Sequence, residues 1–304
     1  MKNKALKRLI CGLSALLVCF SLFSFKLVPI LKKDTLVNRG FKLKTIIVDA
    51  GHGGRPSGST GNFSHGASGS YSTERGVTLA IALKLQTAIE KELNGVKVVL
   101  TRKTEDDVSW QERSAIANEN KGDLFISIHC NALPDRHVRE EAGRKHHKTV
   151  YRTVTVPDHS GRGVLLLVYG FHRTKEEEKA IKQTQLGGEN EGEEMNAAPD
   201  PNDPESTILV NQYKAKFRTR SIHLANLINT EFVDTDGRKS GGIIEQGVLV
   251  LCHSAMPAVL VETGFIDNPD DEAYLNSENG QNEIVASIVR ALKNYKDDVE
   301  QVVK

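Results

Sequence analysis

The chain has 304 residues, with 40 lysines and arginines against 39 aspartates and glutamates. This length allows one large α/β domain or two small ones. The near-neutral charge gives no support for nucleic acid as a partner, because proteins that bind it carry a basic face. Hydrophobic residues make up only 39% of the chain. The excess of polar residues lies in two stretches, at 133–162 and 172–206, so the rest of the chain can form a more hydrophobic core than this average indicates.

The N-terminal 25 residues differ from the rest of the chain. Four of the first eight residues are lysine or arginine, and residues 9–25 carry no charge. A basic start before an apolar stretch of this length is typical of an export signal or of a single anchor helix. We predict a signal peptide or anchor over 1–30, a linker over 31–44, and an exported protein of the periplasm or cell envelope, with cleavage and membrane anchoring both left open.

The body begins with alternating strands and helices. Short apolar runs bounded by turn residues predict buried strands at 45–50, 96–102 and 123–131. Apolar residues at helical spacing predict helices over 77–93 and 110–120. This alternation is the signature of a parallel sheet with helices on its faces.

The second half is less regular. Further strands are predicted at 163–170, 248–252 and 258–264, and helices at 174–185, 206–232 and around 284–292. The acidic stretch 187–205 reads as a solvated segment. We therefore predict an α/β fold with a mostly parallel, twisted sheet of about six strands and helices on both faces. The catalytic domain is predicted to span 45–297, with an insertion at 133–206.

Four short motifs carry side chains suited to metal chemistry. They are VDAGHGG (48–54), STERGVTLAIALKL (72–85), SIHCNA (127–132) and VLVETGFIDN (259–268), which contain His52, Glu74, His129 and Glu262. Two imidazoles and one carboxylate are a catalytic zinc set, with one coordination position left for water. A second carboxylate is what such a site requires as a proton carrier.

The predicted strands bring these residues together. His52, His129 and Glu262 each lie at the carboxyl end of a strand, where functional groups gather in open α/β sheets. Glu74 begins a helix, and the preceding loop can return it to the same edge. Considered one at a time, each histidine is more simply explained as a hydrogen-bonded side chain than as a metal ligand. Glu74 alone is more simply explained as a carboxylate in the first turn of a helix, where the helix dipole favours it. A carboxylate after the apolar run 259–261, however, costs free energy unless it is paired or used.

Only two cysteines, Cys130 and Cys252, lie in the body. Each falls in an apolar, strand-like run, which favours a small buried core residue, while a disulfide between them stays open. A cysteine hydrolase is disfavoured, because neighbours such as His129 and Cys130 point to opposite faces of a strand.

On these motifs, the body from about 45 to 296 resembles the zinc-dependent type-3 N-acetylmuramoyl-L-alanine amidases. The stretches LTR (100–102) and ER-x-x-IAN (112–118) also match. The resemblance implies the family's α/β fold and peptidoglycan as substrate, cleaved at the amide between the lactyl group of muramic acid and L-alanine. It also implies the roles of four residues: Zn²⁺ held by His52, Glu74 and His129, and Glu262 as the catalytic residue.

Two departures from the family pattern accompany this match. Cys130 stands where the family usually has alanine, and the loop 53–73 is somewhat long, with His65 interpreted as a loop residue. Other functions remain as alternatives: a zinc peptidase acting within wall peptides, and a non-catalytic wall-binding protein.

The segment 171–206 is a candidate regulatory element. Members of the resembled family that act in cell division carry an extra helix whose glutamate occupies the open zinc position, and an activator protein as partner would relieve this autoinhibition. Such a role here would fit cell-wall remodelling or daughter-cell separation. The alternative is a solvated acidic insertion. The candidate glutamates are Glu176, Glu177, Glu178, Glu189, Glu191, Glu193 and Glu194.

Overall fold

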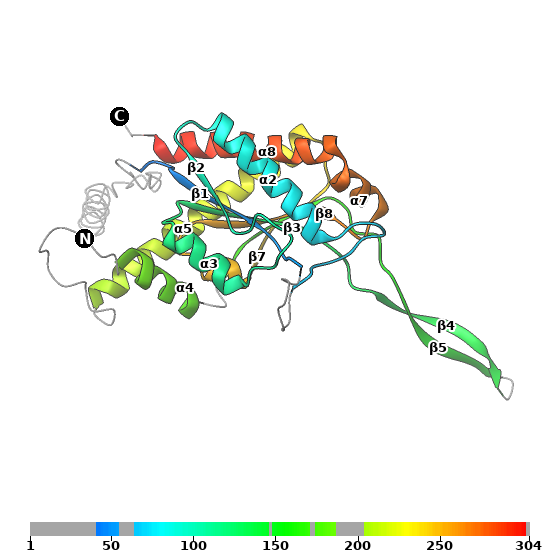
Figure 1. The fold of residues 1–304 in the computed structure, drawn as a ribbon. Coiled ribbons are helices and arrows are strands. Elements are labelled where there is room, and N and C mark those ends of the chain that lie inside the picture. The colour runs from blue at the N-terminus through cyan, green and yellow to red at the C-terminus, as the bar shows by residue number, and fades with distance from the viewer. Residues whose placement is uncertain (1–40, 55–63, 146–147, 171–173, 187–203, 302–304) are drawn as a thin grey trace, which may run out of the picture. The chain divides into compact units, whose positions relative to one another are not determined.

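The computed structural model describes residues 41–54, 64–145, 148–170, 174–186 and 204–301 (Figure 1). The first half of this part follows the predicted alternation of strands and helices. Its elements are β1 (Thr45–Ala50), α2 (Glu74–Glu92), β2 (Lys97–Leu100), α3 (Trp110–Glu119) and β3 (Leu124–Asn131). Within the described residues, the central sheet has six strands in the order β2-β1-β3-β8-β6-β7.

The sheet is parallel except at one junction. β1 pairs in parallel with β2 and β3, and β3 pairs in parallel with β8 (Ala258–Phe265). β6 (Val164–Tyr169) runs antiparallel to β8 and parallel to the edge strand β7 (Ser240–Gln246). The central strands are almost wholly buried apolar runs, as strands covered on both faces must be. The predicted fold class, a mostly parallel six-stranded α/β sheet, is confirmed.

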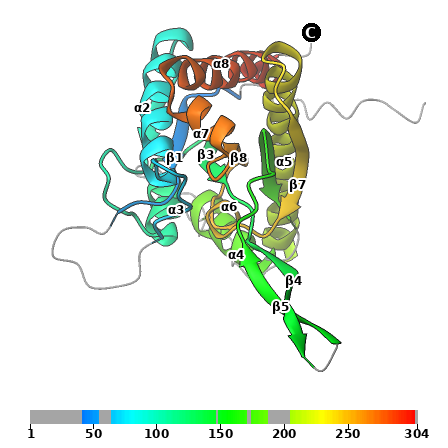
Figure 2. The ribbon, with the colours of Figure 1, turned by 90° about the vertical axis from the view of Figure 1, so that its right-hand side faces the viewer.

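Helices cover both faces of the sheet (Figure 2). α2, α5 (Pro204–Thr230) and α8 (Glu278–Glu300) enclose one hydrophobic core with Ile46 and Val48. α3 and α6 (Leu249–Cys252) enclose a second core with Ile47 and Phe125 on the other face. Because side chains alternate along a strand, this parity also sends Ser127 and the later odd-numbered residues of β3 toward the α3 face.

One predicted strand is wrong. Residues 249–252 form the short helix α6, closed by a hydrogen bond from the Cys252 N–H to the Val248 carbonyl at 3.1 Å. The edge position belongs instead to β7, and α6 inserts its apolar side chains beneath the sheet. A short apolar run looks the same in a buried strand and in a buried helical turn. The structure forms no disulfide between Cys130 and Cys252.

The polar stretch after β3 forms an antiparallel hairpin of β4 (Arg136–Lys145) and β5 (Lys148–Val156). It extends away from the central sheet (Figures 1 and 2). Its base is fastened beside the end of β8, where the Asn268 side-chain amide donates to the His159 carbonyl at 2.6 Å. The predicted insertion 133–206 therefore contains a hairpin that lies outside the central sheet, followed by β6, a strand of that sheet.

The remaining helices pack at the ends of the sheet. α4 (Thr174–Ile181), continued by a π-helical turn (Lys182–Leu186), packs against α5 and α6, and α7 (Pro269–Asn276) follows β8. A π-helical turn (Glu231–Thr235) also continues α5, consistent with the long helix predicted there. In the described part of the chain no helix is long and apolar enough to cross a membrane. The predicted leader over 1–30 lies outside the described residues.

The buried carboxyl of Glu177 on α4 makes stability depend on pH. Burial raises the pKa of Glu177 to about 7, against the opposing charge of Lys214. A carboxyl with a raised pKa binds its proton more tightly in the folded state. Its contribution to stability is therefore complete below the unfolded-state pKa and is lost as the pH rises through 7.

We expect Glu177→Gln to raise the free energy of unfolding by about 1 kcal/mol at roughly pH 8, and to change it little at roughly pH 4. Urea unfolding at both pH values measures the difference. A gain of equal size at the two pH values would contradict the ionisation argument.

Candidate metal centre and active site

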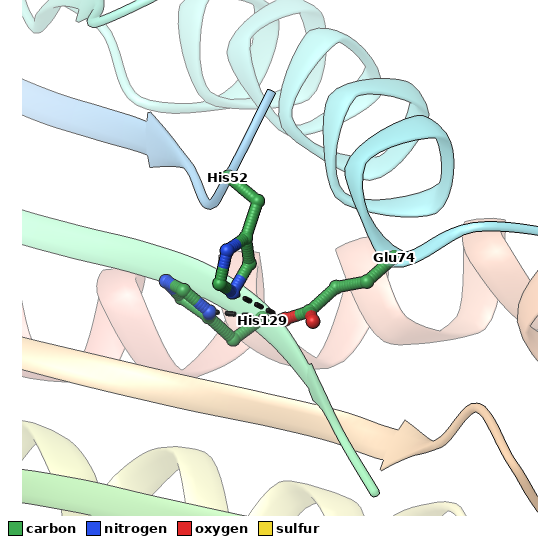
Figure 3. A group of neighbouring side chains, drawn as sticks. All are labelled: His52, Glu74 and His129. Carbon is green, nitrogen blue, oxygen red and sulfur yellow. Dashed lines mark hydrogen bonds and ion pairs between the residues drawn. The ribbon is translucent and has the colours of Figure 1, made fainter. Parts of the chain in front are cut away.

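Three of the four predicted residues meet at the carboxyl edge of the sheet (Figure 3). His52 directly follows β1, Glu74 is the first residue of α2, and His129 lies near the end of β3. One carboxylate oxygen of Glu74, Oε1, lies 3.2 Å from His52 Nε2 and 3.0 Å from His129 Nδ1. One nitrogen or oxygen from each residue lies within 4.8 Å of the others. This spacing suits a single metal ion.

The backbone at His52 is unusual. His52 has φ of 58°, in the left-handed region that non-glycine residues rarely adopt. Its carbonyl accepts a hydrogen bond from Arg113 Nη2 at 2.7 Å. The preceding residue must be glycine, because a Cβ on Gly51 would lie 2.4 Å from the His129 ring. The conformation at His52 is thus held by contacts from other segments.

Behind His52 lies a buried ion pair between Asp49 and Arg113. Arg113 Nη1 contacts Asp49 Oδ1 at 2.7 Å, and Thr101 and Ser127 donate their hydroxyl hydrogens to the same carboxylate. Burial alone would raise the pKa of Asp49, but Arg113 and the two hydroxyls outweigh it and hold the pKa below its usual value. Asp49 is therefore held in its ionised form as the partner of Arg113.

A second buried arginine completes this support. Arg102, at the end of the LTR stretch, donates to the carbonyls of Ala50 and Gly51 at 2.8 and 2.9 Å. Arg102 and Arg113 both fall in stretches that match the resembled amidase family, but the match by itself assigns them no role. The one usable signal was Asp49, because a charged residue within a buried apolar strand must find a partner.

The loop before α2 wraps around the three residues. Ser64 lies against His52 Nδ1, with its hydroxyl oxygen at 2.6 Å and its carbonyl oxygen at 3.2 Å. The Ala67 N–H donates to Glu74 Oε2 at 2.7 Å, and the Cys130 N–H donates to Oε1 at 3.0 Å. Burial would raise the pKa of Glu74, but hydrogen bonds with His129 and His52 and the charges of these rings hold the pKa well below its usual range.

Glu262 lies on the neighbouring strand, in direct register with His129. In-register residues of adjacent strands are about 5 Å apart and point to the same face. Its Oε2 is buried without a hydrogen-bond partner among the described residues. Burial raises the pKa of Glu262 to about 7, with His129 opposing the rise and Glu74 adding to it. Glu262 therefore stands beside the three-residue group without belonging to it.

A cleft opens next to His52 and His129 on the α3 side of the sheet. Residues 108–111, at the start of α3, form one wall, and residues 248–250, at the start of α6, form the other. The walls meet where the Trp110 and His253 rings pack with centroids 4.6 Å apart. The lining combines apolar side chains such as Trp110 and Val248 with polar ones such as Gln111, as ligand clefts commonly do.

The other candidate residues of the sequence are not part of the three-residue group. His65 is an exposed loop residue, 3.2 Å from Arg75 Nη1. Cys130 and Cys252 are buried, and burial raises the pKa of the Cys130 thiol well above its usual value, which disfavours a nucleophilic thiolate.

The described glutamates of the candidate regulatory segment point elsewhere. Glu177 is buried beside Phe217 of α5, and Glu178 pairs with Lys214 at 2.9 Å. In the described ranges, the group of potential metal ligands contains no glutamate of α4. The remaining candidates, Glu189, Glu191, Glu193 and Glu194, lie outside the described residues.

Comparisons with known proteins show the family to which the chain belongs. The family model described as N-acetylmuramoyl-L-alanine amidase matches residues 46–294. A putative N-acetylmuramoyl-L-alanine amidase of Buchnera aphidicola subsp. Baizongia pistaciae is 30% identical over 82% of this chain and 95% of its own length. The amidase AmiC of Escherichia coli O6:H1 is 28% identical over 83% of this chain but only 53% of its own length.

Solved structures share the fold. An N-acetylmuramoyl-L-alanine amidase from Clostridium difficile 630 superposes with a TM-score of 0.53 and 22% identity, over 84% of this chain and 98% of that one. Ami1 from Mycobacterium smegmatis gives a TM-score of 0.53 at 18% identity, over 84% and 99%.

The fold is a mostly parallel α/β sheet that brings a His-Glu-His group suited to a metal ion to its carboxyl edge. The chain belongs to the N-acetylmuramoyl-L-alanine amidase family. It is accordingly an amidase of peptidoglycan, as the motifs predicted.

The Asp49–Arg113 pair predicts a stability effect that charge alone does not. Arg113→Lys keeps the charge but removes the planar fork that reaches Asp49 and the His52 carbonyl together. We expect the free energy of unfolding to fall by about 3 kcal/mol, because buried acceptors lose their partners. Urea unfolding in excess chelator measures this without a contribution from bound metal.

The matched control is Arg152→Lys, on the exposed hairpin, where the arginine pairs with Glu140. It should change stability by no more than about 0.5 kcal/mol. Similar losses in both variants would mean that the fork of Arg113 has no special role.

Proposed function

We propose that this chain is a zinc-dependent enzyme that cleaves the amide between the lactyl group of N-acetylmuramic acid and L-alanine of the stem peptide. One observation carries the proposal. Glu262, a half-buried residue whose Oε2 is buried without a partner among the described residues, stands in register with His129 beside a compact group of three potential metal ligands. A carboxyl that neither pairs nor ligates at such a place is available for proton transfer.

The three-residue group fits zinc. Imidazole nitrogen and carboxylate oxygen are ligands that zinc prefers, and three protein ligands are the usual catalytic number. The Ser64 carbonyl beside His52 Nδ1 also fits, because it favours the tautomer that leaves Nε2 free to ligate. We propose His52, Glu74 and His129 as the ligands. Zinc bound there supplies Lewis acidity, which polarises an amide carbonyl and makes water more acidic.

Glu262 is the proposed general base and acid. Its carboxylate takes a proton from the attacking water as the oxygen–carbon bond forms at the amide carbonyl. The same carboxyl then donates this proton to the L-alanine nitrogen as the carbon–nitrogen bond breaks. Because its Oε2 is buried, a proton held on this oxygen is shielded from bulk solvent between the two transfers. The cleft walls at 108–111 and 248–250 open beside His52 and His129, and we propose that they hold the substrate next to these ligands.

The proposal predicts that two substitutions separate metal binding from chemistry. Glu262→Gln should lower kcat at least about 100-fold while zinc content stays at the wild-type level, since general acid–base catalysis supplies a factor of this order. His129→Ala should lose zinc and activity together. Metal content by elemental analysis and release of soluble peptides from peptidoglycan provide the two readouts.

His65→Ala is the control, because this histidine lies in the same loop region but outside the proposed ligand set. It should keep both zinc and activity. Full activity in Glu262→Gln with metal bound would show that another group carries the proton.

The bond that is cut distinguishes the proposal from its alternatives. Purified peptidoglycan is digested with the metal-loaded protein, and the products are identified by mass. Free stem peptides that begin with L-alanine support the amidase. Fragments cut within the stem would instead indicate a zinc peptidase, and retention on the polymer without any product would indicate a wall-binding protein.

We propose that the chain is exported by its N-terminal segment, 1–30, to the periplasm or cell envelope, and that residues 45–297 form the catalytic domain. A role in wall remodelling or daughter-cell separation would follow. The solved CwlD amidase of Clostridioides difficile is in complex with the GerS lipoprotein. For this chain we propose an activator protein that relieves inhibition by a glutamate of 171–206.

Deleting residues 187–203, which include four of the candidate glutamates, tests this regulation and leaves the sequences of α4 and α5 intact. If a glutamate of that stretch blocks the metal, basal kcat should rise by about tenfold or more, because an inhibitory contact worth about 1.4 kcal/mol is removed. Peptidoglycan release by the purified proteins measures the change. Equal rates with and without the stretch would rule out autoinhibition by these glutamates.

A further inference from the structure

A buried carboxylate outside the proposed ligand set receives four hydrogen bonds from the loop that leads to Glu74. Glu272, on α7, is 1% exposed. Its Oε2 accepts from the Ser70 N–H at 2.8 Å. Its Oε1 accepts from the N–H groups of Tyr71 and Ser72, both at 2.9 Å, and from the Ser72 hydroxyl at 2.8 Å. Three successive backbone N–H groups thus converge on one side chain about 200 residues away.

The loop is shaped for this contact. A Cβ on Gly69 would lie 2.2 Å from Glu272 Oε1, so only glycine lets the loop approach. The Asn276 amide, one turn further along α7, donates to the Ser72 hydroxyl at 2.9 Å. Ser72 therefore connects two side chains of α7, and the loop lies directly on this helix.

The other end of the loop bears on the proposed metal ligand. The Glu74 N–H donates to the Ala67 carbonyl at 3.0 Å, and the Ala67 N–H donates to Glu74 Oε2 at 2.7 Å. Glu74 is only two residues beyond Ser72. A loop released from Glu272 would free both the backbone of Glu74 and the N–H that orients its carboxylate.

Glu272 acts as a charged acceptor. Burial on its own would raise the pKa of Glu272, but the hydrogen bonds from Tyr71, Ser70 and Ser72 hold it below the usual value. Hydrogen bonds to an ionised acceptor are about twice as strong as neutral ones. A glutamine would keep the shape but place an N–H₂ group against one of the loop's donors.

The helix that carries Glu272 is fixed to the strand that carries Glu262. Asn268 caps α7 by accepting from the N–H groups of Asp270 and Asp271, and Asp271 Oδ2 accepts from the Phe265 N–H at the end of β8. Glu272 therefore joins the segment of the proposed base to the segment of a proposed ligand.

We propose that Glu272 is a positioning residue that sets the metal affinity of the site by holding the loop 66–73, and with it Glu74, in the ligating conformation. This inference rests on the proposed metal-binding role of His52, Glu74 and His129. Metal binds only the molecules in which Glu74 is correctly placed. If the fraction of such molecules falls tenfold, the apparent Kd for metal rises tenfold.

The test compares zinc affinity in a graded series. Ser72→Ala removes the hydroxyl contact alone, Glu272→Gln keeps volume but loses charge, and Glu272→Ala removes all four bonds. Competition with a chromophoric chelator gives the zinc Kd of each folded protein, and circular dichroism with urea unfolding in chelator gives the folded fraction. We expect the Kd to rise about twofold, several-fold and at least about tenfold along the series. The kcat should fall in the same order at limiting zinc and recover in part at saturating zinc.

Glu278→Ala is the matched control. Glu278 is an exposed carboxylate at the start of α8 that pairs with Lys84 at 2.8 Å, and its loss changes the net charge equally. Its zinc Kd should stay at the wild-type value. If Glu272→Ala does not fold, Glu272→Gln still decides the question. A Glu272 variant that is folded but less stable, with zinc Kd within twofold of wild type, would reduce Glu272 to a structural residue and overturn the inference. Failure of the wild-type protein to bind zinc would instead overturn the metal centre, and this inference with it.

Discussion

The buried pair of Asp49 and Arg113 organises the edge of the sheet where the site is built. A charge within an apolar strand costs free energy unless it is paired and hydrogen-bonded. Arg113 meets this requirement, and its Nη2 also donates to the His52 carbonyl. The same guanidinium thereby stabilises both a charge in β1 and the left-handed backbone that follows it. The position of His52 therefore depends on the same guanidinium that pairs with the Asp49 charge. Loss of this guanidinium would leave both the Asp49 carboxylate and the His52 carbonyl without their Arg113 contact.

The carboxyl groups near this edge divide into two kinds. Asp49, Glu74 and Glu272 each have several partners drawn from distant segments, and each joins those segments. Glu262 has an oxygen with no partner. A satisfied carboxylate stabilises an arrangement, whereas an unsatisfied one remains available to a ligand or a proton. This contrast, more than position alone, separates the proposed general base from the groups that support the site.

The sequence predicted most elements around the site but not every one. The central strands were recognisable because runs such as 45–50 and 123–131 are too apolar to lie anywhere but inside a sheet. The run 248–252 is equally apolar and became a helical turn, because β7 occupied the sheet edge and left the turn as a wall of the cleft. The hairpin at 136–156 escaped prediction because its alternation is weak and its polar residues resemble those of a loop.

The sequence alone determined the family and the mostly parallel α/β architecture, and it predicted the four residues of the candidate site. Those features follow from local patterns: apolar runs, helical spacing and short motifs at the ends of strands. Only the tertiary structure decided how the residues are held. Arg102, Arg113 and Glu272 act through hydrogen bonds to backbone groups 50 to 200 residues away. No local pattern records such a bond, because its acceptor or donor is a peptide group that every residue possesses.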